Sequence, residues 1–134
     1  MKIANFMVQH ELSPEQISAG LYNPNMTNEE KDILKKLMLV DSNTDKIYPQ
    51  ALELFDFIVR ILKRENVNDF HIMGQANLML CLYKIKFIET TFIDERYGMW
   101  ESTTERVSQE VKNPDGTTTK TNVFKFVKLR KYGR

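Results

Sequence analysis

Hydrophobic residues recur at helical spacing in several stretches of the chain. A capping-box sequence at residues 27–30 precedes the first stretch, and Pro49 opens a second that we expect to end near Asn66. Residues 76–86 form a third stretch, which is more apolar than the other two. The pattern Ser-Pro-Glu-Gln at residues 13–16 predicts a further short helix ahead of them.

The segments expected to be extended are short near the N-terminus and long near the C-terminus. Residues 2–9 and 69–73 are brief apolar runs, which are typical of buried strands. Residues 100–111 and 118–130 are rich in Thr, Val and Phe, and the sequence Asn-Pro-Asp-Gly at residues 113–116 joins them. This turn chemistry between two extended runs predicts a β-hairpin.

Residues 88–98 permit two interpretations. The β-branched residues between Ile88 and Ile93 favour a strand, whereas a helix continuing through this segment would end at Gly98. We favour the helix, because Tyr97-Gly98 before a new alternating run is typical of a helix stop.

The order of these elements predicts an α/β fold with a parallel core and an antiparallel edge. No repeat, low-complexity tract or linker interrupts the sequence, so residues 1–134 are expected to form one domain. Ligands of such sheets bind beyond the carboxyl ends of the strands. We therefore expect residues 9–10, residues 74–75 and one end of the hairpin to lie near one another.

Composition and cysteine content narrow the class of protein. The chain has 134 residues, of which 42% are hydrophobic and 28% are charged, as in packed globular domains. No apolar run reaches about 18 residues, which speaks against a membrane span, and no secretory signal is recognisable. The single cysteine, Cys81, rules out an internal disulfide and fits a cytoplasmic location, and we interpret it as a buried apolar residue.

The net charge of +1 conceals an uneven distribution. Residues 117–134 contain six basic side chains and no acidic one, while residues 1–116 carry a net charge of −5. A basic end on an acidic body indicates an anionic partner for that end. A solvated tail that only aids solubility is the alternative, and charge alone does not separate the two.

The turn at Gly74-Gln75-Ala76-Asn77 lies between a predicted strand and the start of a predicted helix. Free backbone N–H groups and the helix dipole favour a phosphate at such a place. Gly74 allows a ligand to approach the backbone, and Gln75 or Asn77 would add hydrogen bonds to a phosphate or a base. An ordinary strand-to-helix turn explains the same residues.

Histidines and metal ligands are few. His10 follows the first strand and is a candidate general acid, general base or phosphate donor, with a hydrogen bond to a neighbouring loop as the alternative. His71 alternates within a strand, and we interpret it as structural. The histidines, the cysteine and the carboxylates show no metal-ligand spacing, so we expect no metal site. Any phosphodiester cleavage would then use the 2′-OH of RNA as its nucleophile.

The first hairpin strand carries the groups that such a reaction needs. Arg106 would stabilise the developing negative charge, and Thr103 and Thr104 supply neighbouring hydroxyl donors. Arg130 and Lys128 on the returning strand would add cations. The alternative is that all of these are exposed cross-strand residues of an ordinary hairpin.

Both ends of the sequence resemble one small protein family. Ser-Thr-Thr-Glu-Arg at residues 102–106, the glycine-tipped hairpin and Val-Phe-Lys-Phe-Val-Lys-Leu-Arg-Lys-Tyr at residues 123–132 resemble the C-terminal signature of the CRISPR-associated Csx-twenty family. Residues 9–16 are similar to its opening, and residues 72–75 to its strand that ends in glycine. The chain departs from the family pattern at Phe126, where histidine is frequent, at Leu129 and at residues 99–100.

The resemblance implies a small Rossmann-like (CARF-like) three-layer domain with a C-terminal antiparallel hairpin. It implies that a homodimer binds cyclic oligoadenylate, with cyclic tetra-adenylate favoured, and linearises it as a ring nuclease without metal or cofactor. Neither a membrane nor a long nucleic acid is expected as a stable partner. The catalytic residues would be Arg106, Thr104, Thr103 and His10, and the ligand-binding residues Gln9, Gly74, Gln75, Asn77, Glu105, Lys128 and Arg130.

Two other functions fit the same sequence. A protein that binds the cyclic oligoadenylate without cleaving it is the first, because Glu105 and His10 are the only evident general bases for a reaction at Arg106. A nucleic-acid-binding adaptor is the second, and it predicts binding to long RNA with a steep dependence on salt.

Overall fold

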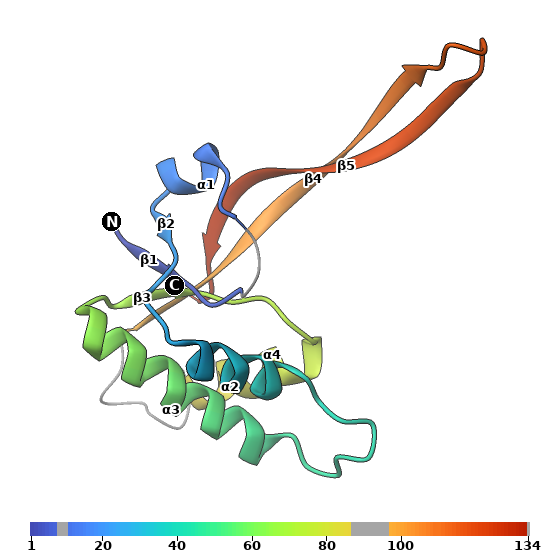
Figure 1. Cartoon of the computed structure of the whole chain (residues 1–134). Coiled ribbons are helices and arrows are strands. Elements are labelled where there is room, and N and C mark those ends of the chain that lie inside the picture. Colours follow the sequence, from blue (N-terminus) through green and yellow to red (C-terminus); the bar gives the residue numbers. More distant parts are fainter. Residues whose placement is uncertain (8–10, 87–96, 134) are drawn as a thin grey trace.

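The computed structural model describes residues 1–7, 11–86 and 97–133, which form a mixed α/β fold (Figure 1). Within them, a five-stranded sheet has the order β2-β1-β3-β4-β5. β2, β1, β3 and β4 are parallel, and β5 runs antiparallel to β4. The strands are β1 (Ile3–Asn5), β2 (Leu21–Tyr22), β3 (Asp69–His71), β4 (Gly98–Lys112) and β5 (Thr118–Lys131). The predicted α/β fold, with a parallel core and an antiparallel edge, is confirmed.

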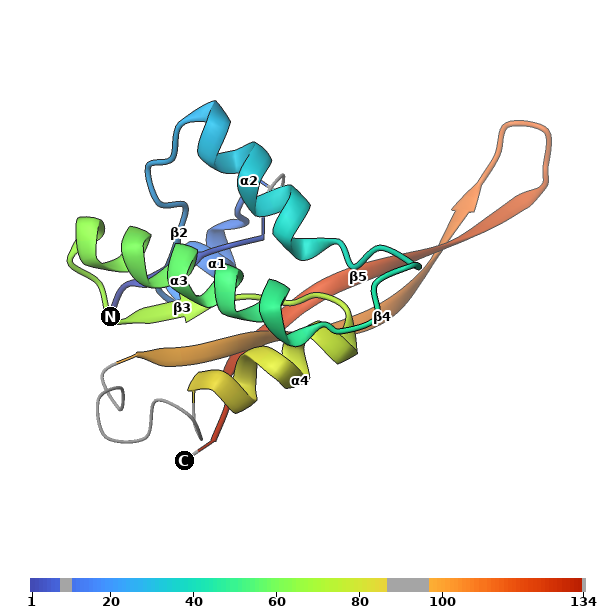
Figure 2. The ribbon, with the colours of Figure 1, turned by 90° about the horizontal axis from the view of Figure 1, so that it is seen from below.

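The helices are distributed unequally over the two faces of the sheet (Figures 1 and 2). Those described are α1 (Pro14–Ser18), α2 (Asn28–Met38), α3 (Tyr48–Glu65) and α4 (Ala76–Lys84). α2, α3 and α4 cover one face and enclose the hydrophobic core with it. α1 lies on the other face and has no buried residue. One side of the sheet is therefore well covered, and the other only lightly.

Alternation along the short strands assigns residues to these two faces. Ala4, Phe70 and Met99 are fully buried in the core beneath the helices. Asn5 and His71 take the intervening positions and point to the lightly covered face. Because a strand has a period of two, β1 delivers Asn5 to that face and β3 delivers both Asp69 and His71.

Local signals place the helix ends as predicted. Both capping boxes form, at Ser13 with Gln16 and at Thr27 with Glu30, each with its two reciprocal hydrogen bonds. α3 ends at Asn66, whose φ of 57° is a left-handed C-cap.

Three details differ from the sequence prediction. β2 was not predicted, because two residues are too short to show a pattern, and pairing with β1 creates it. β1 and β3 are both shorter than the predicted runs at residues 2–9 and 69–73. Gly98 is the first residue of β4 and pairs with Asp69, while the interpretation of residues 88–96 lies outside the described part of the chain.

The predicted hairpin forms and projects far beyond the rest of the molecule (Figures 1 and 2). We call residues 104–126 the arm and the other described residues the body. A β-bulge between Thr103 and Thr104 separates the two parts of β4. At the tip, Gly116 adopts a φ of 88° and donates a hydrogen bond from its N–H to the carbonyl of Asn113. Apolar residues of the arm are exposed, with Phe124 at 68% and Val111 at 51%.

Two further findings concern the classes of protein considered above. No helix among the described residues is long and apolar enough to cross a membrane. Cys81 carries a free thiol and packs, partly buried, against the core. Cys81 was interpreted as a buried apolar residue; it does pack against the apolar core, but it is only partly buried.

Candidate functional site

A chain of polar side chains crosses the carboxyl ends of the parallel strands on the lightly covered face. His71 Nδ1 lies 3.0 Å from Asn5 Oδ1, and His71 Nε2 lies 3.1 Å from Ser102 Oγ. These residues come from β3, β1 and β4, which are neighbours in the sheet. Asn5 and His71 are both 4% exposed, and Ser102 is partly exposed. The side chains thus form a continuous path from the buried edge of β1 to an accessible hydroxyl.

The contacts of Asn5 determine which nitrogen of His71 carries the proton. The Asn5 Nδ2 amide donates to Met7 O at 3.2 Å and to Asn23 Oδ1 at 2.9 Å, and Asn5 Oδ1 accepts from Met7 N at 3.0 Å. The atom facing His71 is therefore an acceptor, so Nδ1 of the imidazole must be the donor. In the neutral ring Nε2 is then left as an acceptor for the Ser102 hydroxyl.

Burial keeps this imidazole neutral. Desolvation lowers the pKa of His71 to about 4, although the nearby carboxylate of Glu101 acts in the opposite direction. At neutral pH the ring therefore presents an unprotonated Nε2 to Ser102. This is the form that accepts a proton in general base catalysis.

The Asn5 end of the chain opens on a cleft of about 480 Å³. Its lining includes Asn5, Met7 and Asn23, together with charged residues of α2. In the strand order β2-β1-β3, β2 and β3 lie on opposite sides of β1, so the winding direction reverses between β1 and β3, where Asn5 meets His71. The cleft itself lies beside this point, next to residues that follow β1 and β2. Ligands of open α/β sheets bind at such a reversal, beyond the carboxyl ends of the strands.

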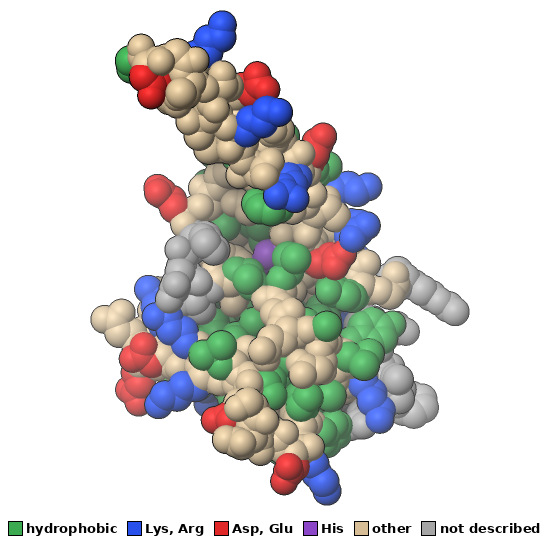
Figure 3. Space-filling model, turned by 90° about the vertical axis from the view of Figure 1, so that its right-hand side faces the viewer, with side chains coloured by type: hydrophobic (Ala, Val, Ile, Leu, Met, Phe, Trp, Pro, Cys, Tyr) green, Lys and Arg blue, Asp and Glu red, His purple; other side chains and the backbone are tan. Residues whose placement is uncertain are grey.

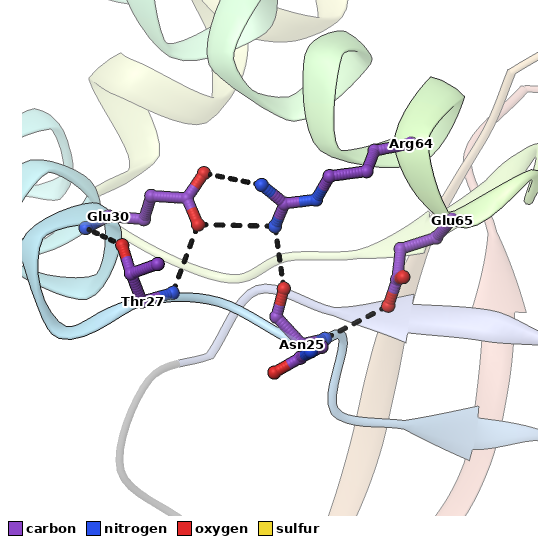
Figure 4. A network of polar contacts seen from close by, with 5 residues as sticks. All are labelled: Asn25, Thr27, Glu30, Arg64 and Glu65. Atoms are coloured by element: carbon purple, nitrogen blue, oxygen red, sulfur yellow. Dashed lines mark hydrogen bonds and ion pairs between the residues drawn. The ribbon is translucent and has the colours of Figure 1, made fainter.

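A second polar cluster holds the loop that forms one wall of this cleft (Figure 4). Arg64 at the end of α3 donates to both carboxylate oxygens of Glu30, at 2.8 and 3.2 Å, and to the carbonyl of Asn25 at 2.6 Å. The Glu65 carboxylate accepts from Asn25 N at 2.9 Å. Hydrogen bonds from Arg64 and from the Thr27 backbone hold the pKa of Glu30 below its usual value. We call these five residues, Asn25, Thr27, Glu30, Arg64 and Glu65, the clasp.

The hairpin residues predicted from the sequence form two groups: those whose side chains already have a partner within the protein, and those that lie exposed on the arm. Arg130 Nη2 lies 2.6 Å from Glu101 Oε1, so its charge is already neutralised within the protein. Thr103 donates from its hydroxyl to the carbonyl of Lys128 at 3.3 Å. Thr104, Glu105 and Arg106 lie exposed on the arm. Arg130 is thus a weaker phosphate ligand than its sequence position suggested, because the anionic partner is already present.

The strand register decides which cations remain free. β4 contributes acidic residues opposite basic residues of β5, including Glu105 opposite Lys125 and Glu110 beside Lys120 at 3.7 Å. Arg106 faces Phe124 instead, and no hydrogen bond or ion pair of its side chain is found within residues 1–7, 11–86 and 97–133. Figure 3 shows this alternation of Lys or Arg with Asp or Glu along the arm, above hydrophobic side chains gathered at its foot. The basic end inferred from the sequence is therefore partly compensated across the hairpin.

The predicted phosphate-binding turn at residues 74–77 lies next to the Asn5–His71–Ser102 chain but contributes no side chain to it. The Ser102 hydroxyl also lies at donor distance, 3.2 Å, from Met73 Sδ, which is a weaker acceptor than His71 Nε2, and Gly74 follows Met73 directly. Gln75 Oε1 accepts from the backbone N–H of Val40, and Asn77 Oδ1 accepts from Leu78 N at 2.7 Å. Gly74, Gln75 and Asn77 are exposed at the start of α4, where Gln75 is the N-cap without a side-chain cap. Gln9 and His10 lie outside the described residues.

The residues that meet most closely here were not proposed from the sequence. His71 was interpreted as structural, and Asn5 and Ser102 were not singled out. A weak signal existed, since Asn5 and His71 are polar residues within short apolar strands. No cluster of three His, Cys, Asp or Glu residues suited to a metal ion occurs in the described part of the chain.

Comparison with known proteins gives a family for the chain. Residues 2–130 match the model of the uncharacterized protein MJ1673 family, and the chain belongs to this family. No curated protein and no solved structure matches it. The description of the family names no activity, so a function has to be argued from the geometry of the site.

Proposed function

We propose that this member of the MJ1673 family binds a cyclic oligoadenylate where the arm meets the body, near Ser102, and linearises it. The observation that carries the proposal is the position of the Asn5–His71–Ser102 chain, at the carboxyl ends of parallel strands where the winding direction reverses. The exposed Arg106 on the same strand as Ser102 supplies a cation that no described residue neutralises. Polar groups at the carboxyl ends of the strands, with an exposed cation four residues beyond Ser102 along β4, suit an anionic nucleotide ligand.

The strand order supports a Rossmann-like interpretation of the domain. β2-β1-β3-β4-β5 is the order of flavodoxin-like doubly wound sheets, with the last strand reversed. The light cover on the second face is a departure, because doubly wound sheets carry substantial helices on both faces. We therefore propose a reduced Rossmann-like domain, located in the cytoplasm where a nucleotide messenger would act.

The proposed reaction needs no cofactor. The 2′-oxygen of one adenylate attacks its own adjacent phosphorus, the bond from phosphorus to the 5′-oxygen breaks, and a 2′,3′-cyclic phosphate remains. The 5′-oxygen takes a proton from solvent. Arg106 would stabilise the charge that develops on the phosphoryl oxygens, and Thr104 and Lys128 would orient the phosphate. A ring with repeated phosphates fits the two-fold axis of a homodimer, in which each subunit presents the same patch.

The test is incubation of the purified protein with labelled cyclic tetra-adenylate in EDTA, followed by mass spectrometry. We expect linear products that end in a 2′,3′-cyclic phosphate, and light scattering should report a dimer. An intact ring that stays tightly bound would instead favour sequestration. Absence of binding to the ring, together with tight and salt-sensitive binding to long RNA, would replace the proposal by the adaptor function.

A matched pair of variants tests the cation. Arg106→Ala should abolish cleavage, because it removes the free guanidinium on the strand that leaves the site. Lys120→Ala, near the tip of the arm and paired with Glu110, should retain the wild-type rate. Equal rates for the two variants would show that Arg106 does not act in the reaction.

A further inference from the structure

The Asn5–His71–Ser102 chain contains the three parts of a base-activated hydroxyl. A hydroxyl lies within hydrogen-bond distance of an imidazole nitrogen, at 3.1 Å, and the other nitrogen is held by a third side chain at 3.0 Å. This sequence of hydroxyl, base and orienting group is the geometric signature of activated oxygen nucleophiles and proton relays in enzymes. The amide of Asn5 takes the orienting position.

Several observations distinguish this chain from a histidine that is merely satisfied in a core. The orientation of Asn5 is fixed by three other hydrogen bonds, to Met7 O, Met7 N and Asn23 Oδ1. That orientation directs the free Nε2 lone pair to Ser102, which is partly exposed rather than buried. The inner end of the chain borders the 480 Å³ cleft, and the outer end lies on the strand that carries Arg106.

We propose that Ser102 is a catalytic residue of the ring opening: its hydroxyl accepts the proton of the attacking 2′-OH and passes its own proton to His71. The inference rests on the proposed function and names the general base that the sequence left open. As the 2′-oxygen bonds to phosphorus, its proton moves to Ser102 Oγ, and the Ser102 proton moves to His71 Nε2. Asn5 Oδ1 holds the Nδ1–H of the resulting imidazolium, which later returns the proton to solvent through Ser102.

The charges near the ring determine how the relay responds to pH. On the elements packed around His71 these are Asp69 on β3, Glu101 on β4 and Arg130 on β5. Asp69 accepts a hydrogen bond from the Trp100 indole at 2.9 Å, and Arg130 neutralises Glu101. Burial therefore dominates and keeps the ring unprotonated in mildly acidic solution. The rate should decline only as the pH falls toward 4, well below the titration of an ordinary histidine.

The experiment measures binding and cleavage of cyclic tetra-adenylate separately. Ser102→Ala and His71→Gln should leave the Kd unchanged and slow single-turnover cleavage by about 10²-fold or more. Ser102→Thr keeps the hydroxyl and should recover much of the rate. Ser108→Ala removes an exposed hydroxyl from the arm and should cleave like the wild type. His71→Gln should also lose the acid limb of the pH–rate profile, which a structural role would not affect.

The outcomes separate the two proposals. If the wild-type protein cleaves and both Ser102→Ala and His71→Gln keep its rate and acid limb, the relay is wrong while the proposed function stands. If the wild-type protein binds the ring without cleaving it, both the relay and the proposed linearisation are wrong, and sequestration replaces them. If the ring is not bound at all, the proposed function fails. Thermal melting of each variant identifies loss of folding, and the acid limb of the wild-type profile tests the relay without any substitution.

Discussion

The body and the arm belong to one sheet, yet they are stabilised in different ways. In the body, apolar residues of β1, β3 and the first part of β4 are covered by α2, α3 and α4, and residues such as Phe70 are 0% exposed. In the arm, cross-strand pairs are the main contacts, and Phe124 is 68% exposed. A two-stranded ribbon by itself is marginally stable in water. The comparison shows that the body is stabilised mainly by burial of apolar residues in tertiary packing, whereas the arm is stabilised mainly by its turn and by cross-strand pairs.

The largest expected effect comes from a matched pair of phenylalanine substitutions. Phe70→Ala removes a ring that is buried beneath the helices and packs edge-on against Phe6, and it should lower the free energy of unfolding by about 3–5 kcal/mol. Phe124→Ala in the arm should change it by less than about 0.5 kcal/mol. Urea unfolding followed by circular dichroism gives both values. Similar losses would mean that Phe124 is covered by something outside this chain, such as a second subunit.

The next effect concerns the buried histidine of the body. The folded pKa of His71 is about 4 and lies below the ordinary value of 6.5, so the unfolded state binds more protons between these two pH values. The contribution of the neutral His71 to the free energy of unfolding is fully present above about pH 6.5. It should fall by up to about 3 kcal/mol as the pH decreases toward 4. His71→Gln should flatten this slope. Denaturation midpoints across the pH range provide the measurement, and an unchanged slope would exclude His71 as its source.

A smaller effect should remain confined to the arm. Gly116 has a φ of 88°, so Gly116→Ala forces a left-handed conformation that costs about 1 kcal/mol. Amide hydrogen exchange in the arm should accelerate roughly fivefold, with no change in the core of the body. Gly116→Asn is the control, because asparagine tolerates this conformation. Equal acceleration in α3 would show that the arm and the body unfold together.

The smallest effect is expected at the clasp of the body. Arg64→Ala removes the guanidinium that bridges Glu30 and Asn25, and it should lower Tm by about 2 °C. The folded pKa of Glu30 is lowered, so this contribution is present at neutral pH and disappears as the pH falls through that pKa. Lys63→Ala, one residue earlier in α3, is the control. The hydrogen bond to the Asn25 carbonyl does not titrate, so the Tm difference between the two variants should shrink in strong acid, and a difference that does not shrink would contradict the contribution of the Glu30 ion pair.

The sequence by itself determined the features that depend on residues close to one another along the chain. Capping boxes at Ser13 and Thr27, the end of α3 at Asn66 and the turn before Gly116 all follow from short-range chemistry and occur as predicted. The hairpin and the α/β order follow from apolar periodicity over a few residues. Short-range patterns also located Arg106, which lies opposite Phe124 on the arm and is paired with no acidic side chain among the described residues.

Only the tertiary structure decided which polar groups meet. His71 is separated by 66 residues from Asn5 and by 31 from Ser102, and the order and register of β1, β3 and β4 bring the three together. Within the hairpin, the separate register of β4 against β5 pairs Arg130 with Glu101 and leaves Arg106 opposite Phe124. The hairpin register follows from its local turn, whereas the register of β1, β3 and β4 is set by how the whole sheet packs beneath its helices, so no short stretch of sequence contains it. That is the physical reason why the hairpin was predictable and the Asn5–His71–Ser102 chain was not.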